Sequence, residues 1–215
     1  MNSLYLYSPE ICNYNCFMLK KYFANPYLLM LLASNLYCIW YFNSRSNGFV
    51  TVVWIYWLQS VIIGFFNFVD LLTIKNYDAR DIKVNGQPMT EKGRGCLPWF
   101  FALHFGIFHL VYMIFIAVYL GINVDKRFFL IGVAAFLSES LSSFIRQKNA
   151  EQQMKFEIGS IFFLPYLRVI PMHLMIMGSV FLSVQPSLIF LVLKTIADIL
   201  SFMWYQKMWE QAADK

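Results

Sequence analysis

The sequence predicts an all-α fold, a polytopic transmembrane bundle of about six helices with both termini in the cytoplasm. Three observations predict it. Of the 215 residues, 59% are apolar and only 13% are charged, whereas a soluble domain carries about 25% charged residues. Apolar runs of about twenty residues, the length that crosses a bilayer, recur along the chain. Positively charged residues gather on alternate loops, as they do in membrane proteins of fixed orientation.

Residues 1–25 precede the first long apolar run and are predicted to form a cytoplasmic or interfacial segment. Ser8 and Pro9 are typical of a helix start, so we expect residues 9–24 to lie along the membrane surface. The segment lacks the basic start and apolar core of a secretory signal peptide. The six-helix transmembrane domain is expected at residues 26–206, followed by a cytoplasmic tail at 207–215.

Apolar runs define the six expected spans. They cover residues 26–42, 49–74, 97–120, 128–145, 169–184 and 186–206. Pro171 is expected to kink the fifth helix or to shorten its start, because proline lacks a backbone N–H. The short link at 183–186 predicts that the last two helices form a hairpin. The cytoplasmic loop at 75–96 contains Asn85-Gly86, a typical hairpin turn. We expect a plain surface loop there, since an isolated hairpin is marginal in water.

Lysines and arginines outside the spans fall into two unequal groups. Twelve belong to the N-terminal segment, the second loop, the fourth loop and the tail, and three belong to the opposite side, namely Arg45, Lys126 and Arg127. Such an excess marks the cytoplasmic side of a membrane protein. We therefore expect a multi-pass protein of the cell membrane. The chain has no basic cluster of about five to eight residues, so nucleic acid is not expected as a partner.

Lys194 and Asp198 are the costliest residues in the predicted spans, because a charge inside a bilayer must face protein or water. Four residues apart, they share one helix face and can form an ion pair. Other polar residues lie in the spans at similar depths, namely Gln59, Asn67, His104, His109, Tyr112, Glu139, Arg168 and His173. Together they predict a polar centre in the cytoplasmic half of the bundle. We expect Lys194 and Asp198 to face the third and fifth helices.

Five segments of the chain resemble a known family. They are WLQSVIIGFFN at 57–67, HFGIF at 104–108, SESLSSF at 138–144, PYLRVIPMH at 165–173 and LKTIAD at 193–198. The chain is similar there to an uncharacterised domain-of-unknown-function family of prokaryotic six-helix integral membrane proteins. The resemblance implies the fold and the membrane location, and it brings no activity. The chain departs from the family pattern at Gln59, where Glu is usual, at Tyr112, where a second His is usual, and at Glu139, where a His follows the serine.

A metal site is the first functional hypothesis. Histidine and carboxylate ligands suit zinc, iron or manganese, and His104, His173 and Glu139 would leave room for water or substrate. If the histidines of the family form a metal site, this chain keeps two of them and offers Glu139 as a substitute. A divalent transition metal such as zinc would activate water, which suggests a metal-dependent intramembrane hydrolase. No catalytic motif is resolved, and the same histidines could instead hydrogen-bond between helices.

Two other classes of function stay open. Buried Asp, Glu and His side chains serve proton or ion relays, which favours a small ion- or proton-coupled transporter. Alternatively, the 19% of aromatic residues and the 11 methionines suit packing between subunits. That composition would fit a homo-oligomer, or an accessory or assembly subunit of a larger membrane complex. The lipid bilayer is the partner that all three hypotheses share.

Overall fold

The computed structural model describes residues 25–45, 48–75, 77, 78, 83, 84, 87, 88, 91–151, 156–181 and 188–213. These residues form an all-α fold, as the composition predicts. The six helices among them are α2 (Pro26–Ser44), α3 (Gly48–Thr73), α4 (Glu91–Tyr119), α5 (Lys126–Glu151), α6 (Ile158–Phe181) and α7 (Leu188–Ala213). The helix expected at residues 9–24 and the link expected at 183–186 lie outside the described residues.

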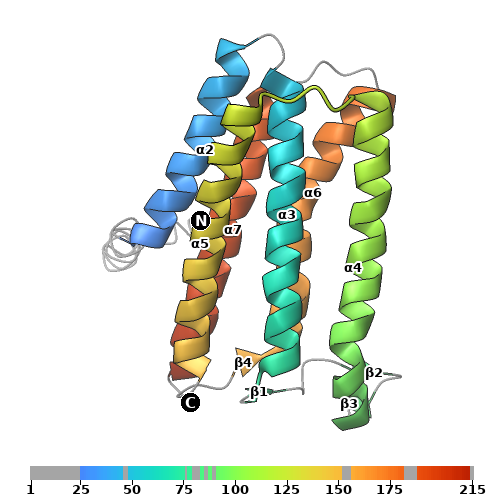
Figure 1. Ribbon diagram of the computed structural model, residues 1–215. Coiled ribbons are helices and arrows are strands. Elements are labelled where there is room, and N and C mark those ends of the chain that lie inside the picture. Colours follow the sequence, from blue (N-terminus) through green and yellow to red (C-terminus); the bar gives the residue numbers. More distant parts are fainter. Residues whose placement is uncertain are drawn as a thin grey trace, which may run out of the picture.

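Helix α3 is the centre of the bundle. It packs against α2, α4, α5 and α6, while α7 packs against α2 and α6. Figure 1 shows the helices lying side by side, with α4 at one edge and α2, α5 and α7 at the other. We call the end that carries the short strands and the last turn of α7 the strand end, and the opposite end the far end. The main core between the helices is therefore built around α3, and a smaller cluster lies between α2 and α7.

Local sequence signals fix the helix ends at two places. Asn25 caps α2 by accepting the N–H of Tyr27 at 3.0 Å, and Pro26 occupies the first turn, where its missing N–H costs nothing. At the far end, Gly121 has a φ of 80° and its N–H bonds to the carbonyl of Ile116. A glycine in this left-handed conformation ends α4 by satisfying its last carbonyls.

Three predicted boundaries differ from the structure. Helix α6 begins at Ile158 rather than at residue 169, with Pro165 and Pro171 both inside it. Pro171 therefore does not shorten the start of this helix. Prolines are tolerated inside such helices because neighbouring helices and side chains satisfy the freed backbone groups. Helix α4 likewise begins at Glu91, within the predicted loop, and α7 extends to Ala213, within the predicted tail.

Short strands close the strand end. Strand β1 (Tyr77–Asp78) pairs in parallel with β4 (Phe156–Glu157), and β2 (Lys83–Val84) pairs antiparallel with β3 (Gln87–Pro88). The strands of the second pair precede and follow residues 85 and 86 in the sequence, so antiparallel pairing occurs where we expected a plain surface loop. The parallel pair joins the segment after α3 to the segment before α6, which holds the strand end of these helices together.

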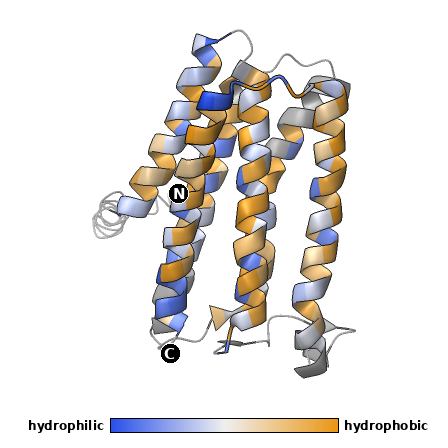
Figure 2. Ribbon diagram, in the orientation of Figure 1, coloured by the Kyte–Doolittle hydropathy of each residue, from blue (hydrophilic) through white to orange (hydrophobic). Residues whose placement is uncertain are grey.

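Apolar side chains cover much of the outer surface. Within the described residues, three stretches are long and apolar enough to cross a membrane, namely Gly48–Thr73, Gly95–Tyr119 and Lys126–Glu151. Large side chains such as Trp40, Phe65 and Val118 are more than half exposed. Figure 2 shows hydrophobic residues over most of the length of α3 and α4, with hydrophilic residues gathered at the strand end of α5. An apolar surface of this extent indicates a membrane protein.

Candidate functional site

Lys194 and Asp198 form a fully enclosed ion pair on α7. The Nζ atom of Lys194 lies 2.6 and 2.7 Å from the two carboxylate oxygens of Asp198. The two residues are 2% and 0% exposed, so neither charge reaches the surface. Their spacing of one helical turn places both on the same face of α7, as the sequence predicts.

Residues of α2 and α3 complete this polar centre. The Asn35 side chain donates to Asp198 at 2.9 Å and to the carbonyl of Leu31 at 3.0 Å. Its amide oxygen accepts from the hydroxyl of Tyr56 at 3.3 Å. Lys194 also lies 5.1 Å from the centre of the Tyr56 ring, within the range of a cation–π interaction. Asn35 thus links the ion pair to Tyr56 through both ends of its amide.

The described partners of the ion pair come from helices that the sequence did not single out. Asn35 and Tyr56 belong to the first and second predicted helices, and contacts with the third and fifth stay a prediction. Sequence reasoning missed both residues, although each is fully buried. The available signal was Asn35 itself, an amide in the middle of an apolar run. Cys38, about one turn further along α2, is also buried.

A pocket of about 80 Å³ lies between α3, α5, α6 and α7, on the strand-end side of the ion pair. That volume holds a few water molecules, since one needs about 10–15 Å³. Its wall contains two predicted site residues, Asn67 and Glu139, and Glu139 is only 3% exposed. The other polar residues of the wall are Asp70, Ser140, Ser143, Arg146 and Gln147. The wall of the pocket therefore combines charges of both signs with apolar side chains.

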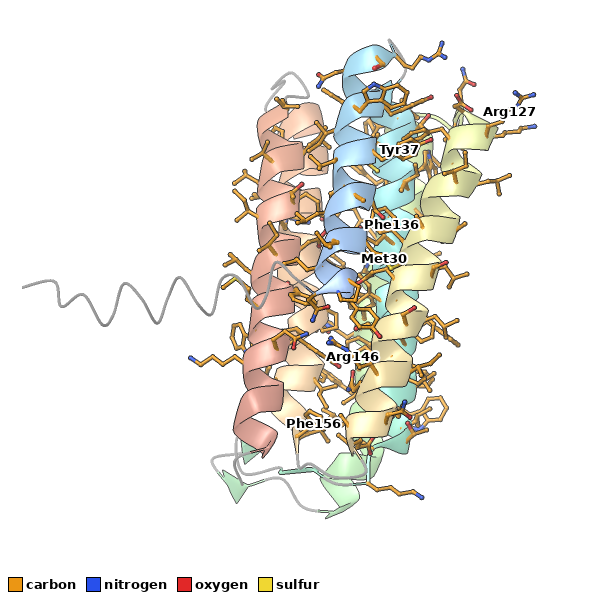
Figure 3. All side chains as sticks on the ribbon, turned by 90° about the vertical axis from the view of Figure 1, so that its left-hand side faces the viewer. Met30, Tyr37, Arg127, Phe136, Arg146 and Phe156 are labelled. Atoms are coloured by element: carbon orange, nitrogen blue, oxygen red, sulfur yellow. The ribbon has the colours of Figure 1, made fainter. Side chains whose placement is uncertain are left out.

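Arg146 carries the positive charge of the pocket. Its guanidinium lies 4.4 Å from the centre of the Tyr27 ring. With the Gln206 amide turned so that its oxygen accepts, that oxygen lies 2.8 and 2.9 Å from the two terminal nitrogens of Arg146. Figure 3 shows Arg146 pointing into the bundle, whereas Arg127 projects away from it at the far end. Arg146 thus connects α5 to both α2 and α7.

The pocket and the polar centre occupy consecutive turns of the same helices. Phe202, in the pocket wall, follows Asp198 by one turn of α7. On α5, Glu139 follows Phe136, whose ring lies edge-on against Tyr56 at 6.3 Å. On α3, the predicted site residue Gln59 lies between Tyr56 and Ile63 of the pocket wall, and it is 1% exposed. Neither polar atom of the Gln59 amide has a hydrogen-bond partner among the described residues.

A charged cluster stands at the strand end below the pocket. Lys148 lies 2.9 Å from a carboxylate oxygen of Asp70 and 2.8 Å from one of Glu151. Glu151 also accepts the backbone N–H of Lys75 at 2.6 Å. These contacts tie the end of α3 to the end of α5. They leave Asp70 in the pocket wall with its charge balanced by Lys148.

The three histidines lie along α4 and α6, away from the ion pair. His104 is exposed and shares a hydrogen bond of 2.9 Å with the Tyr166 hydroxyl. His173 lies with its ring 5.3 Å from that of Tyr112 and 5.9 Å from that of Phe108. His109 is buried, and its Nδ1 bonds to the carbonyl of Phe105 at 2.9 Å. The backbone of Arg168 belongs to α6, and its side chain lies outside the described part of the chain.

The predicted metal ligands fall at two different interfaces. His104 and His173 take part in the contact between α4 and α6, whereas Glu139 belongs to the pocket beside α5. Among the described residues, no group of three or more His, Cys, Asp or Glu residues could hold a metal ion. These contacts give no support to a site formed by these three side chains, and the metal stays a prediction.

Comparison with known proteins identifies the family of this chain. Curated proteins and solved structures give no significant match. A family model described as a family of unknown function, DUF6498, matches residues 18–215, which is nearly the whole chain. The match confirms the resemblance to a domain-of-unknown-function family noted from the sequence segments. The chain, an apolar helical bundle with a buried polar centre, belongs to the DUF6498 family by this match.

Proposed function

We propose that this chain is a small ion- or proton-coupled transporter of the cell membrane. It would cross the bilayer six times with both termini in the cytoplasm. Three helices are long and apolar enough to cross a membrane, and α2, α6 and α7 pack beside them in the same bundle. The excess of lysine and arginine, twelve against three, supports a strand end that faces the cytoplasm.

The observation that carries the proposal is the enclosed Lys194–Asp198 pair with its Asn35 and Tyr56 contacts. One charged residue at the centre of a spanning helix costs about 2.5–3.5 kcal/mol by insertion measurements. A buried ion pair adds little net stability, because apolar residues of similar volume often stabilise a fold equally well. Its presence inside an apolar bundle therefore favours a functional role.

The neighbouring pocket would supply the route to this pair. A cation or proton from the strand end would meet the Glu139 carboxylate in the pocket wall, and Phe202 of the same wall lies one turn of α7 from Asp198. Protonation of Asp198 would weaken its attraction for Lys194 and release one of the two groups to a new partner. Asn35 could then rotate its amide, since it already donates to Asp198 and accepts from Tyr56. Such a change of partners between α2 and α7 is the two-state element that coupled transport requires.

The alternative is that the polar centre only holds helices together. Polar side chains in membrane bundles commonly do this, at about 0.6–2 kcal/mol per contact. The two interpretations differ in what the Lys194→Met, Asp198→Leu double variant does, because it leaves no unpaired buried charge. If the pair only holds helices together, this variant keeps the wild-type flux; if the pair serves transport, the variant folds but loses flux.

Proteoliposomes loaded with the pH dye pyranine test the proposal. Gradients of sodium chloride, potassium chloride and a mixture of amino acids are imposed one at a time. We expect one of them to drive proton movement with wild type and none to do so with the Lys194→Met, Asp198→Leu double variant, which leaves no unpaired buried charge. Ser201→Ala is the matched control, because Ser201 is a buried polar residue on the same helix that bonds only to the Ala197 carbonyl in the described contacts. If no gradient moves protons faster than in protein-free vesicles, and labelled sodium and potassium are taken up no faster either, the proposal fails.

A further inference from the structure

A second cavity lies between α3 and α4, on the side of the bundle away from the ion pair. Its volume is about 210 Å³, larger than the cavity of about 150 Å³ that binds benzene in an engineered protein. Four phenylalanines line it, namely Phe65, Phe68, Phe101 and Phe105. Phe65 is 59% exposed, so the cavity borders the outer, apolar surface of the helix pair.

Two glycines shape this cavity. A Cβ atom on Gly64 would come within 2.3 Å of the Phe105 ring, so only glycine lets that ring lie against α3. A Cβ atom on Gly106 would meet nothing within 4 Å, which places open space directly beside the backbone of α4. Glycine backbone and aromatic rings therefore form much of the wall of this cavity, which suits a planar apolar group.

His109 also lines the cavity, and its ring carries a buried polar atom that lacks a partner among the described residues. The residue is 4% exposed, and its ring stacks on Phe105 at 4.1 Å. Its Nδ1 bonds to the carbonyl of Phe105, which can only accept, so Nδ1 carries a hydrogen. In the neutral ring Nε2 is then a hydrogen-bond acceptor, and it has no partner among the described residues. A buried polar atom left without a partner is costly and calls for an explanation.

We propose that this cavity binds a small aromatic molecule that carries one hydrogen-bond donor, such as a phenol, which enters from the bilayer. The ring would lie among the phenylalanines and beside Gly106, and its hydroxyl would donate to Nε2 of His109. The site is independent of the transport proposal, because its lining residues do not include Lys194, Asp198, Asn35 or Tyr56 and none of them lines the pocket beside Glu139.

Fluorine NMR of the purified full chain in lipid nanodiscs tests this site with two probes. 4-Fluorophenol has the donor, and 4-fluoroanisole has the same ring with the oxygen capped. We expect saturable binding of both, with the phenol bound about three- to tenfold more tightly, which is the usual net value of one hydrogen bond. Equal affinities for the two probes, or no saturable binding of the phenol, would overturn the proposal. If lipid acyl chains fill the cavity instead, one of these two results is expected.

Two variants locate the binding. Gly106→Val fills the open space and should abolish binding of both probes, while Gly95→Val makes the same change where a Cβ also meets nothing within 4 Å but outside the cavity. His109→Phe should equalise the affinities of the two probes, and His104→Phe, the matched change on the exposed side of α4, should not. Unchanged phenol binding in folded Gly106→Val would place the probe elsewhere and contradict the assignment.

Discussion

The Asn35 side chain donates a hydrogen bond to the Asp198 carboxylate at 2.9 Å, across 163 positions of the chain. This bond ties α2 to α7 at the point where α7 carries its two buried charges. It turns a pair that could have been complete within one helix into a contact among three helices, because Asn35 also accepts from Tyr56 of α3.

Removal of the Asn35 amide should weaken the bundle. In Asn35→Ala, Asp198 loses one donor and Tyr56 loses its acceptor, so we expect the free energy of unfolding to fall by about 1–3 kcal/mol. Thermal unfolding in mild detergent measures the change. Asn43→Ala is the control, since Asn43 is an exposed residue of the same helix. Equal melting temperatures for the two variants would mean that the Asn35 contact contributes nothing.

Replacement of the two charges should depend strongly on whether one or both are changed. Lys194→Met or Asp198→Leu alone leaves an uncompensated buried charge, and we expect each to destabilise the fold by about 3–5 kcal/mol. The double variant removes both charges and should recover most of that loss. Unfolding measurements on wild type and the three variants form a double-mutant cycle, which gives the coupling energy of the two side chains. Losses that simply add in the double variant would show that the two side chains are not coupled.

Asp125 should make the far end sensitive to acid. Its carboxylate accepts the N–H groups of Phe128 and Arg127 at the start of α5 and the hydroxyl of Tyr41. The Phe128 bond foremost, with the Tyr41 and Arg127 bonds and the charge of Arg45, lowers the pKa of Asp125 below its ordinary value.

Because this pKa is lower in the folded than in the unfolded chain, the stabilisation is present above about pH 4 and is lost as the pH falls through the folded-state pKa. Asp125→Ala should therefore melt at a lower temperature than wild type at pH 7, and the difference should shrink below about pH 4. Asp125→Asn keeps a capping side chain and should lose less at pH 7. A difference between wild type and Asp125→Ala that is the same from pH 3 to pH 7 would contradict this account.

The proposed orientation makes a prediction about thiol labelling. In a background with Cys12, Cys16 and Cys96 changed to serine, a cysteine is placed at Arg127 or at Lys207, both of which are exposed. A membrane-impermeant maleimide should label position 127 in intact cells and position 207 only after permeabilisation. The reverse pattern would show that the strand end faces outward.

The sequence was sufficient to predict the helices, because an apolar run long enough to cross a bilayer can adopt few other structures there. It failed at the start of α6, where the rule that proline breaks a helix competes with burial. Pro165 and Pro171 are both buried inside α6, where neighbouring helices support the chain. Proline is therefore a weak boundary signal in a bundle of this kind.

The ion pair could be predicted from the spacing of Lys194 and Asp198, but its partners could not. Which faces of two helices meet depends on their rotation, and polar residues at one depth can point to different neighbours. His104 bonds to Tyr166 of α6, while Glu139 lines the pocket beside α5. The sequence had predicted a similar depth in the membrane for both residues. Asn35 carries no charge that would single it out in the sequence, and its role becomes visible only in the packing of α2 on α7.

Proton flux through the Lys194→Met, Asp198→Leu double variant tests the central claim most directly. The measurement compares pyranine-loaded proteoliposomes of wild type and of the variant under the solute gradient that gives the largest wild-type response. Because the double variant should keep its fold, a loss of flux cannot be ascribed to unfolding. We predict flux with wild type and only the protein-free rate with the variant, at similar melting temperatures. Equal flux in the two proteins would show that the buried pair serves the structure alone.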